Sequence, residues 1–325
     1  MPSWRSWHRP LVVFSAVMAL GALISAVGLV ADDRVLVDAP IWAKPFKFYV
    51  SFTVYGLSLA WMLAQSTWGR RTGWWAGNVV VATSLVEMAI ITVQVVRGKR
   101  SHFNVETPFD RALFMAMGIT VIVLWAGTLV IGILLLRTRF ADRATAWAIR
   151  GGVLIALVGA GIGFLMTLPS AEQRAGGTGS PDVIGAHSVG VPDGGPSMPL
   201  TGWSTTGGDL RIPHFVGMHA LQLIPLFLIA LLLLAPRITR LRDAGLRLRL
   251  VRVVTAGYTG LVALTTWQAL RGQPLIHPDA VTLIAAGLLL VAVAAGVGAA
   301  LRRPPAPTPV RVESEPPSPS KEFTA

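Results

Sequence analysis

Long apolar stretches recur along the chain, separated by short segments that hold most of its charged residues. Eight of them are long enough to cross a bilayer, which takes about 20 mostly apolar residues in a helix. They are Leu11–Ala31, Phe46–Ala64, Trp74–Val96, Ala112–Leu136, Ala146–Leu168, Pro213–Ala235, Val251–Leu270 and Ala280–Ala300. Because they are continuously apolar and not alternating, they indicate helices instead of barrel strands. The pattern predicts an all-α polytopic membrane protein with eight transmembrane helices.

The composition agrees with a chain that resides in lipid. Hydrophobic residues make up 53% of the sequence and charged residues 14%, whereas soluble domains carry about 25% charged residues. This argues against a soluble enzyme and a nucleic-acid-binding protein, although the net charge is +12. The chain has no cysteine, which excludes disulfides, zinc–thiolate sites and iron–sulfur clusters. The expected partners are the lipid bilayer and a small molecule or ion, with no nucleic acid.

The basic residues predict the orientation, because cytoplasmic loops are enriched in Lys and Arg. With the N-terminus in the cytoplasm, the inner segments hold 16 of the 28 basic residues and the outer loops hold 10. The acids follow the opposite trend, with five inside and ten outside. We therefore predict a protein of the cell (inner) membrane with both termini in the cytoplasm.

Residues 1–302 are predicted to form one transmembrane domain, and two segments differ from its short connections. Residues 169–212 form a long outer loop rich in Gly and Pro, and loops of that length are usually functional or disordered. Its later part, Gly194–Asp209, is expected to fold onto the helices. Residues 303–325 are rich in Pro, Ser and Glu, and they predict a disordered cytoplasmic tail.

A short motif occurs twice in the chain. Gln94–Gly98, which reads QVVRG, ends the third span, and Gln268–Gly272, which reads QALRG, ends the seventh. A histidine and another span follow each of them. One interpretation is a duplication with halves at residues 1–145 and 146–302, since parallel repeats occur in membrane folds. The other is chance, because Gln, Arg and Gly all favour a helix end at the interface.

Five of the six histidines map to the outer loops or to the outer ends of spans. Neutral imidazole is a good ligand for haem iron, copper and zinc. We therefore predict His102, His214, His219 and His277 as candidate ligands of haem or a divalent metal ion, with His187 as a weaker candidate. The alternative is that all five are ordinary polar residues of the interface.

Glu87 is the only acidic residue within a span. A charge at that depth is costly, so Glu87 is expected to face the bundle, to be protonated or to be paired. Gln94 lies on the same face of the third span as Glu87. In the sixth span, Gln222 follows His219 by three residues and therefore shares a face with it. These three residues, Glu87, Gln94 and Gln222, are predicted to support the histidine site or to relay protons.

Three further residues bear on where a ligand could bind. Lys44 and Lys47 flank the start of the second span. They suit the anionic headgroup of a lipid or a haem propionate, or they snorkel to the interface as lysines often do. Pro225 lies within the sixth span, where it is expected to kink the helix and expose carbonyls to a cavity.

Two segments carry a resemblance. Trp203–Gln222 and Arg97–Asn104 resemble segments of uncharacterised bacterial multi-pass membrane proteins, a likeness that implies no activity. In layout alone, the chain is similar to heme A synthase, which has two four-helix halves with histidines at outer helix ends. Here His214 or His219 opens the sixth span and His277 opens the eighth, but the second span begins without a histidine. Likeness at the level of the fold is a weak guide to function.

Several functions remain open from the sequence. The leading hypothesis is a haem or metal site at the outer end of the bundle. A proton-coupled transporter or channel that uses Glu87 is the first alternative. An intramembrane metal-dependent hydrolase of the zinc ceramidase type is the second, and the missing His-x-x-x-His pair counts against it. A structural or sensory membrane protein is the third.

Overall fold

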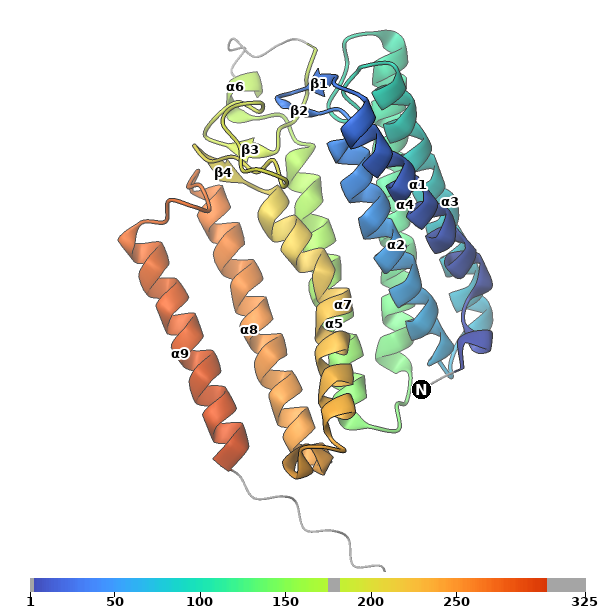
Figure 1. Ribbon diagram of the computed structural model, residues 1–325, viewed down its shortest axis with the longest axis vertical. Coiled ribbons are helices and arrows are strands. Elements are labelled where there is room, and N and C mark those ends of the chain that lie inside the picture. The colour runs from blue at the N-terminus through green and yellow to red at the C-terminus, as the bar shows by residue number, and fades with distance from the viewer. Residues whose placement is uncertain (1–2, 175–181, 303–325) are drawn as a thin grey trace, which may run out of the picture.

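The computed structural model describes residues 3–174 and 182–302, and eight helices in these ranges are long and apolar enough to cross a membrane. The chain is therefore an all-α, multi-pass membrane protein, which confirms the predicted fold class (Figure 1). The long helices are α1 (Arg9–Ala31), α2 (Ala43–Ala64), α3 (Arg70–Val96), α4 (Pro108–Arg137), α5 (Arg143–Met166), α7 (Arg211–Leu234), α8 (Ala244–Leu270) and α9 (Ala280–Arg302). The predicted tail, 303–325, lies outside the described residues.

Several helices begin before the apolar stretch that predicted them, because polar residues cap their first turns. Thr107 before α4, Asp142 before α5 and Asp243 before α8 each accept a hydrogen bond from the backbone N–H three residues ahead. The donor–acceptor distances are 3.1, 2.9 and 3.0 Å. Such caps satisfy backbone donors that have no partner within the helix. The helices therefore extend past the hydrocarbon core into the interface.

The helices form two groups that meet along a seam. The most extensive packing is between α1 and α2, α3 and α4, α5 and α7, and α8 and α9. Figure 1 shows α1–α4 on one side, α5, α7 and α8 on the other, and α9 at the far edge. The two groups meet where α4 packs on α5 and where α2 faces α7. Only 6% of the apolar window of α9 is buried within the protein, so most of this helix is left to face lipid.

Short strands and loops cover one end of the bundle, the upper end in Figure 1. A small antiparallel hairpin joins α1 to α2, and a second antiparallel pair lies in the loop that joins α5 to α7 and packs on α8. This loop therefore folds onto the helices, as expected for Gly194–Asp209. The short elements are η1 (Trp4–Ser6), β1 (Val35–Leu36), β2 (Ala39–Pro40), α6 (Ala171–Arg174), β3 (Ser188–Val189), β4 (Gly208–Asp209) and η2 (Thr239–Arg242).

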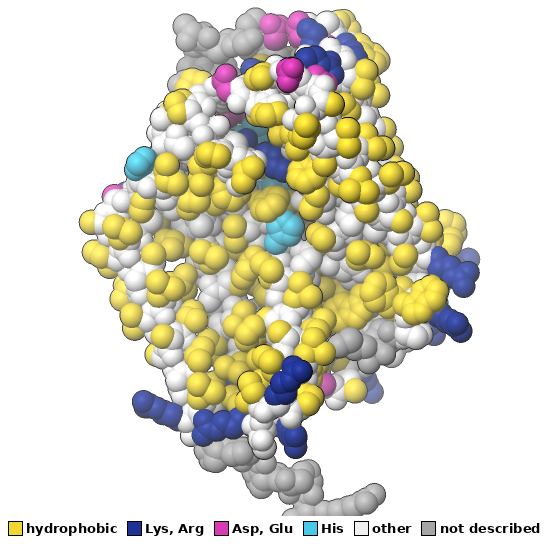
Figure 2. Space-filling view, viewed as in Figure 1, with side chains coloured by type: hydrophobic (Ala, Val, Ile, Leu, Met, Phe, Trp, Pro, Cys, Tyr) yellow, Lys and Arg dark blue, Asp and Glu magenta, His cyan; other side chains and the backbone are white. Residues whose placement is uncertain are grey.

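The two ends of the bundle differ in charge. Figure 2 shows Lys and Arg side chains gathered towards the lower end, whereas most of the Asp and Glu side chains that it shows lie at the upper end. By the enrichment of Lys and Arg in cytoplasmic loops, this arrangement favours a cytoplasmic lower end. The orientation itself stays a prediction.

The tightest helix contact joins α5 to α7 through two glycines. A Cβ atom placed on Gly159 would lie 2.5 Å from the backbone carbon of Gly217, and one on Gly217 would lie 2.6 Å from the Cα of Gly159. Only glycine allows two helix backbones to approach this closely, and membrane helices use such small residues where they pack. The contact fixes the rotation of α7 and thereby decides which of its side chains face α2.

The repeated motif forms the same cap at the ends of α3 and α8. Gly98 and Gly272 both adopt left-handed backbone geometry, with φ of 69° and 71°. The side-chain amides of Gln94 and Gln268 both donate to the carbonyl six residues ahead, at 3.1 and 2.9 Å. The matching caps support a duplication. The division into halves at 145/146 stays a proposal.

Candidate functional site

A cleft of about 780 Å³ runs along the seam between α2 and α7. Figure 2 shows a hollow on this face near the upper end, with basic and histidine side chains inside it, above a surface that is largely hydrophobic. The apolar walls of the cleft comprise Trp7 from the N-terminal segment, Phe46, Val50, Val54, Leu57, Trp61 and Met62 from α2, and Phe215, Leu221, Leu223, Pro225, Leu226 and Ile229 from α7. A large apolar cleft with few polar groups is the usual form of a ligand site.

The lysine and the histidine of the cleft lie in its upper half, and Gln222 lies near its middle. The Lys47 ammonium donates to the Thr201 carbonyl at 2.9 Å. The His219 Nδ1 lies 3.3 Å from the Gln222 amide oxygen, which can only accept, so Nδ1 carries the proton. The His219 ring also meets the edge of Phe215, with centroids 4.3 Å apart. The predicted pairing of His219 with Gln222 is therefore present, in the wall of a cleft that the sequence did not indicate.

A second lysine, Lys44, lies one helical turn above Lys47 on the same face of α2. Its ammonium forms no ion pair within the described residues, and its nearest aromatic ring is Phe48, at 6.0 Å. The side chain is half-buried, with Arg211 and Asp193 within electrostatic range. An enclosed cation without a carboxylate partner is costly, because burial removes its hydration. Lys44 is therefore well placed to receive an anion.

The loop between α5 and α7 is fastened above the cleft by a buried ion pair. Asp209, at 0% exposure, accepts from the Arg211 Nε at 2.9 Å and from the backbone N–H of Ser204 at 2.8 Å. Arg211 also donates to the Gly202 carbonyl at 2.6 Å, next to the carbonyl that Lys47 binds. The turn at 201–202 thus lies over the upper end of the cleft. It accepts one hydrogen bond from Lys47 of α2 and one from Arg211 of α7.

Two of the predicted histidines, His102 and His187, lie in the upper loops on either side of one aromatic ring. The Phe103 ring centroid is 6.1 Å from that of His102 and 4.8 Å from that of His187. The His187 Nδ1 lies 2.8 Å from Asp193, whose carboxylate also accepts from the backbone N–H of Ser188 at 2.8 Å. These hydrogen bonds hold the pKa of Asp193 well below its usual range. They also fix the His187 tautomer with its proton on Nδ1.

Burial lowers the pKa of both His102 and His187, and the Lys44 ammonium adds to this effect. For His187 the hydrogen bond to Asp193 and the negative charge of that carboxylate oppose the shift in pKa without cancelling it. Both rings are therefore neutral in the folded protein at neutral pH. In the unfolded chain they take up protons near the ordinary pKa of about 6.5.

We expect the protein to lose stability as the pH falls from 7.5 to 5.5. Below about pH 6.5 the unfolded state binds protons that the folded state does not, so the free energy of unfolding decreases with falling pH. A drop in Tm of about 3 °C or more is expected. His102→Phe, which keeps a flat ring beside Phe48, should weaken the pH dependence. A Tm independent of pH in the wild-type protein would contradict this account.

The structure brings the predicted histidines only partly together: His214 lies within electrostatic range of His102, His187 and His219. The His214 Nδ1 lies 2.8 Å from the Gly159 carbonyl, at the contact of α7 with α5. His219 lies in the cleft wall, and His277 is exposed in the connection between α8 and α9. Across residues 3–174 and 182–302, no group of three or more His, Cys, Asp or Glu side chains is arranged to hold a metal ion.

Glu87 faces the contact between α3 and α4 and not the cleft. It is 2% exposed and accepts a hydrogen bond from the Thr120 hydroxyl of α4. Ser84, one turn earlier, is fully buried, and in the described part of the chain its hydroxyl has no partner. Lys44 is the cation within electrostatic range of Glu87. The expectation that Glu87 avoids the lipid is therefore consistent with its position.

Gln94 holds the end of α3 to the start of α4. Its amide donates to the Asp110 carboxylate at 2.9 Å, and the Arg97 guanidinium donates to the same oxygen at 2.7 Å. Asp110 is fully buried and also accepts from the Thr107 hydroxyl at 2.6 Å. These contacts give Gln94 a structural role. Its predicted part in a proton relay stays a hypothesis.

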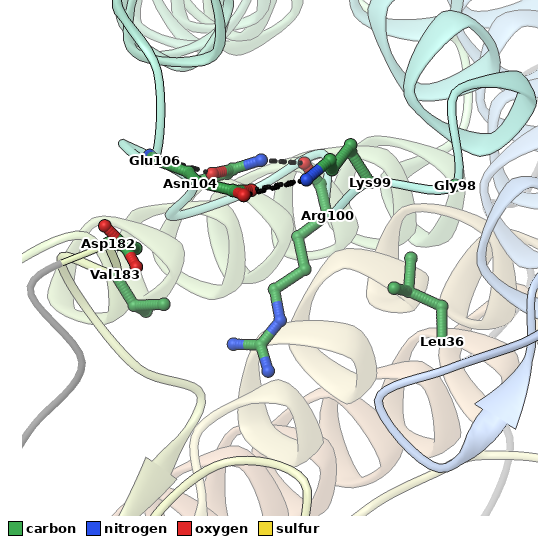
Figure 3. Close-up of a pocket in the computed structure, with 8 residues that line it drawn as sticks. All are labelled: Leu36, Gly98, Lys99, Arg100, Asn104, Glu106, Asp182 and Val183. Carbon is green, nitrogen blue, oxygen red and sulfur yellow. Dashed lines mark hydrogen bonds and ion pairs between the residues drawn. The ribbon is translucent and has the colours of Figure 1, made fainter.

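A second hollow, of about 300 Å³, lies on the upper surface between the connection of α3 to α4 and the loop after α6. In Figure 3 Lys99 reaches across to Glu106, with their charged atoms 2.8 Å apart, while the Arg100 guanidinium points away from that pair. Asp182 and Leu36 also border the hollow. Its lining mixes both signs of charge, so it does not single out a ligand.

Comparison with known protein families, curated proteins and solved structures finds no match. The class of the chain therefore rests on its eight candidate spans, which make it a polytopic membrane protein, and no family is identified. Its function has to be inferred from the geometry of the cleft and of the residues at the upper end.

Sequence reasoning singled out Lys44, Lys47, His219 and Gln222 but missed that α2 and α7 leave a cleft between them. It also missed the pair of Asp209 with Arg211. One signal in the sequence indicates this ion pair. The acid and the arginine lie two residues apart, just before an apolar span. The cleft has no local signal, because it depends on how two distant helices face each other.

Proposed function

We propose that this protein binds an amphiphilic lipid with an anionic headgroup, which enters the cleft between α2 and α7 sideways from the bilayer. The observation that carries the proposal is the distribution of charge along the cleft. Lys47 is the only Lys, Arg, Asp or Glu among its described lining residues, it lies at the upper end, and the unpaired Lys44 lies one turn above it. An apolar slot with cations at one end matches an apolar tail with an anion at one end.

The backbone adds to the positive potential at this end. Both α2, which begins at Ala43, and α7, which begins at Arg211, start at the upper end of the cleft. The N-terminus of a helix carries about half a positive charge, but at α7 the Asp209 carboxylate already binds the Arg211 N–H at 2.9 Å. Together with Lys44 and Lys47, the start of α2 favours an anion here over a zwitterion.

The Lys47 ammonium already lies close to the position in which it would bind a lipid headgroup. The lysine now donates to the neutral carbonyl of Thr201. A phosphate oxygen is a stronger acceptor, because charge-assisted hydrogen bonds are roughly twice as strong as neutral ones. Exchange of one acceptor for the other would release the turn at 201–202 from Lys47 and leave it tied to Arg211 alone.

The other functions considered from the sequence gain less support. Haem or metal binding by His102, His214, His219 and His277 lacks a converging ligand set among the described residues, and the metal-dependent hydrolase depends on the same set. A proton-coupled transporter would rest on Glu87, which does not line the cleft. Lipid binding uses Lys47, which lines the cleft, together with Lys44, which lies one turn above it.

The test is lipid binding to the purified protein, measured by native mass spectrometry. Phosphatidylglycerol should bind at least tenfold more tightly than phosphatidylcholine with the same chains, and Lys47→Gln should reduce that binding about tenfold, as expected for a hydrogen bond to a charged group. Lys99→Gln is the matched control, since Lys99 is paired with Glu106 outside the cleft. Equal binding of the two lipids, or equal effects of the two variants, would rule out the proposal.

A further inference from the structure

The cleft is longer than one leaflet of a bilayer. Its lining extends from Lys47 to Met62 on α2 and from Phe215 to Ile229 on α7, with a lining residue in every turn. At 1.5 Å per residue these walls are about 22 and 21 Å long. Half of a hydrocarbon core of about 30 Å is only about 15 Å. A cleft that begins at the upper interface therefore passes the bilayer midplane.

The lower part of the cleft is built for a hydrocarbon chain and not for a headgroup. Below Lys47 its described lining holds no Lys, Arg, Asp or Glu side chain, and Trp7, Trp61 and Met62 line its lower end. Moving a charged headgroup through such a slot would cost several kcal/mol, because the slot offers it no compensating partner. The shape thus favours a lipid that stays with its head at the top and its tail extended downward.

An ordinary acyl chain fits this length poorly. To reach Met62 from a headgroup at Lys47 it would have to lie fully extended across the midplane, which costs conformational entropy. A polyprenyl tail of about eleven units is roughly three times longer and reaches the lower end of the cleft without that constraint. The upper end of the cleft indicates the headgroup. Lys44 and Lys47 place two amino groups beside one head, and a phosphate monoester carries about two negative charges at neutral pH, which would favour the charged form of both lysines.

We infer that the lipid is a polyprenyl monophosphate, with its phosphate between Lys44 and Lys47 and its tail along the cleft past the midplane. This inference rests on the proposed function and narrows it to a substrate class. The phosphate replaces Thr201 as the partner of Lys47 and gives Lys44 a direct anionic partner, in addition to the Asp193 and Glu87 carboxylates that lie within electrostatic range. The first part of the tail packs between Val54 and Leu226, and the next part reaches Trp61.

The experiment compares three ligands by native mass spectrometry of the full-length protein: a polyprenyl monophosphate of about eleven units, dipalmitoyl phosphatidic acid and inorganic phosphate. The first two share the monoester head and differ in the tail. The polyprenyl lipid should bind about tenfold more tightly than phosphatidic acid, because more of its apolar length is buried. Inorganic phosphate should bind least of all, because it buries no tail.

A substitution in the lower half of the cleft separates tail length from the headgroup. Ser58→Phe fills that half. It should abolish the preference for the polyprenyl lipid and leave the affinity for phosphatidic acid within about twofold of the wild-type value. Ser58→Ala adds no bulk and should keep the preference. Ile229→Trp fills the same region from α7, should give the same result as Ser58→Phe, and serves if that variant fails to fold.

The outcomes distinguish the two proposals. Equal affinity of the wild-type protein for the polyprenyl lipid and phosphatidic acid, or equal losses of both in Ser58→Phe, overturns the polyprenyl assignment and leaves anionic lipid binding standing. No binding of either lipid overturns the proposed function itself. Inorganic phosphate that binds as tightly as the lipids overturns both, because it would show that the tail contributes nothing.

Discussion

Gly217→Leu is expected to destabilise the protein by about 3 kcal/mol, the upper range for overpacking a tight contact. The new side chain would begin 2.6 Å from the Cα of Gly159, and neither backbone can yield without separating α5 from α7. Separation would also break the hydrogen bond between His214 and the Gly159 carbonyl. Thermal unfolding in detergent, followed by loss of helical signal, measures the effect.

The matched control for this prediction is Gly161→Leu in α5, the helix that contributes Gly159 to the contact. A Cβ at Gly161 meets nothing within 4 Å, so the leucine enters open space where lipid or detergent makes room for it. We expect a change within about 0.5 kcal/mol, as for most substitutions away from a packed contact. Similar losses in the two variants would mean that α5 and α7 do not approach each other at Gly159 and Gly217.

Asp209→Asn is expected to cost about 3 kcal/mol, since removing one partner of a buried ion pair typically costs 3–5 kcal/mol and leaves the other charge uncompensated. The Arg211 side chain is 30% exposed, so water relieves part of the penalty and the lower figure applies. The loop above the cleft should loosen, because Asp209 also accepts from the backbone of Ser204. Thermal unfolding gives the energy, and limited proteolysis within residues 182–210 reports the loosening.

Glu106→Gln provides the comparison, because it also removes one carboxylate charge from the upper end. Its pair with Lys99 is exposed on both sides, and exposed pairs contribute about 0–1 kcal/mol. We expect unchanged proteolysis of the loop and a shift in Tm below about 2 °C. If Asp209→Asn had no larger effect than Glu106→Gln, the pair with Arg211 would not be what holds the loop in place.

The transmembrane helices could be predicted from the sequence because their signal is local. Twenty consecutive apolar residues have few alternatives to a spanning helix. The start of α8, near Asp243 and not at Val251, was missed because arginines interrupt its first turns. The N-cap at Asp243 and the length of those side chains let that part of the helix extend into the interface.

The candidate site could be predicted only in part, because it depends on the rotation of helices that are far apart in sequence. The sequence placed His214 and His219 on the same helix but did not decide which of them faces a neighbour. The contact of Gly159 with Gly217 turns His214 towards α5 and leaves His219 beside α2. Lys44 and Lys47 were recognised as anion-binding candidates because their spacing on one helix is a local property.

The most direct test of the central claim is a cryo-electron microscopy map of the protein in nanodiscs made from its native membrane lipid. Our account predicts one elongated density between α2 and α7, with its wide end next to Lys47 and its narrow end passing Val54 towards Trp61. A cleft closed by direct contact of Leu226 with Val54, or a density whose headgroup lies at the Trp61 end, would contradict it.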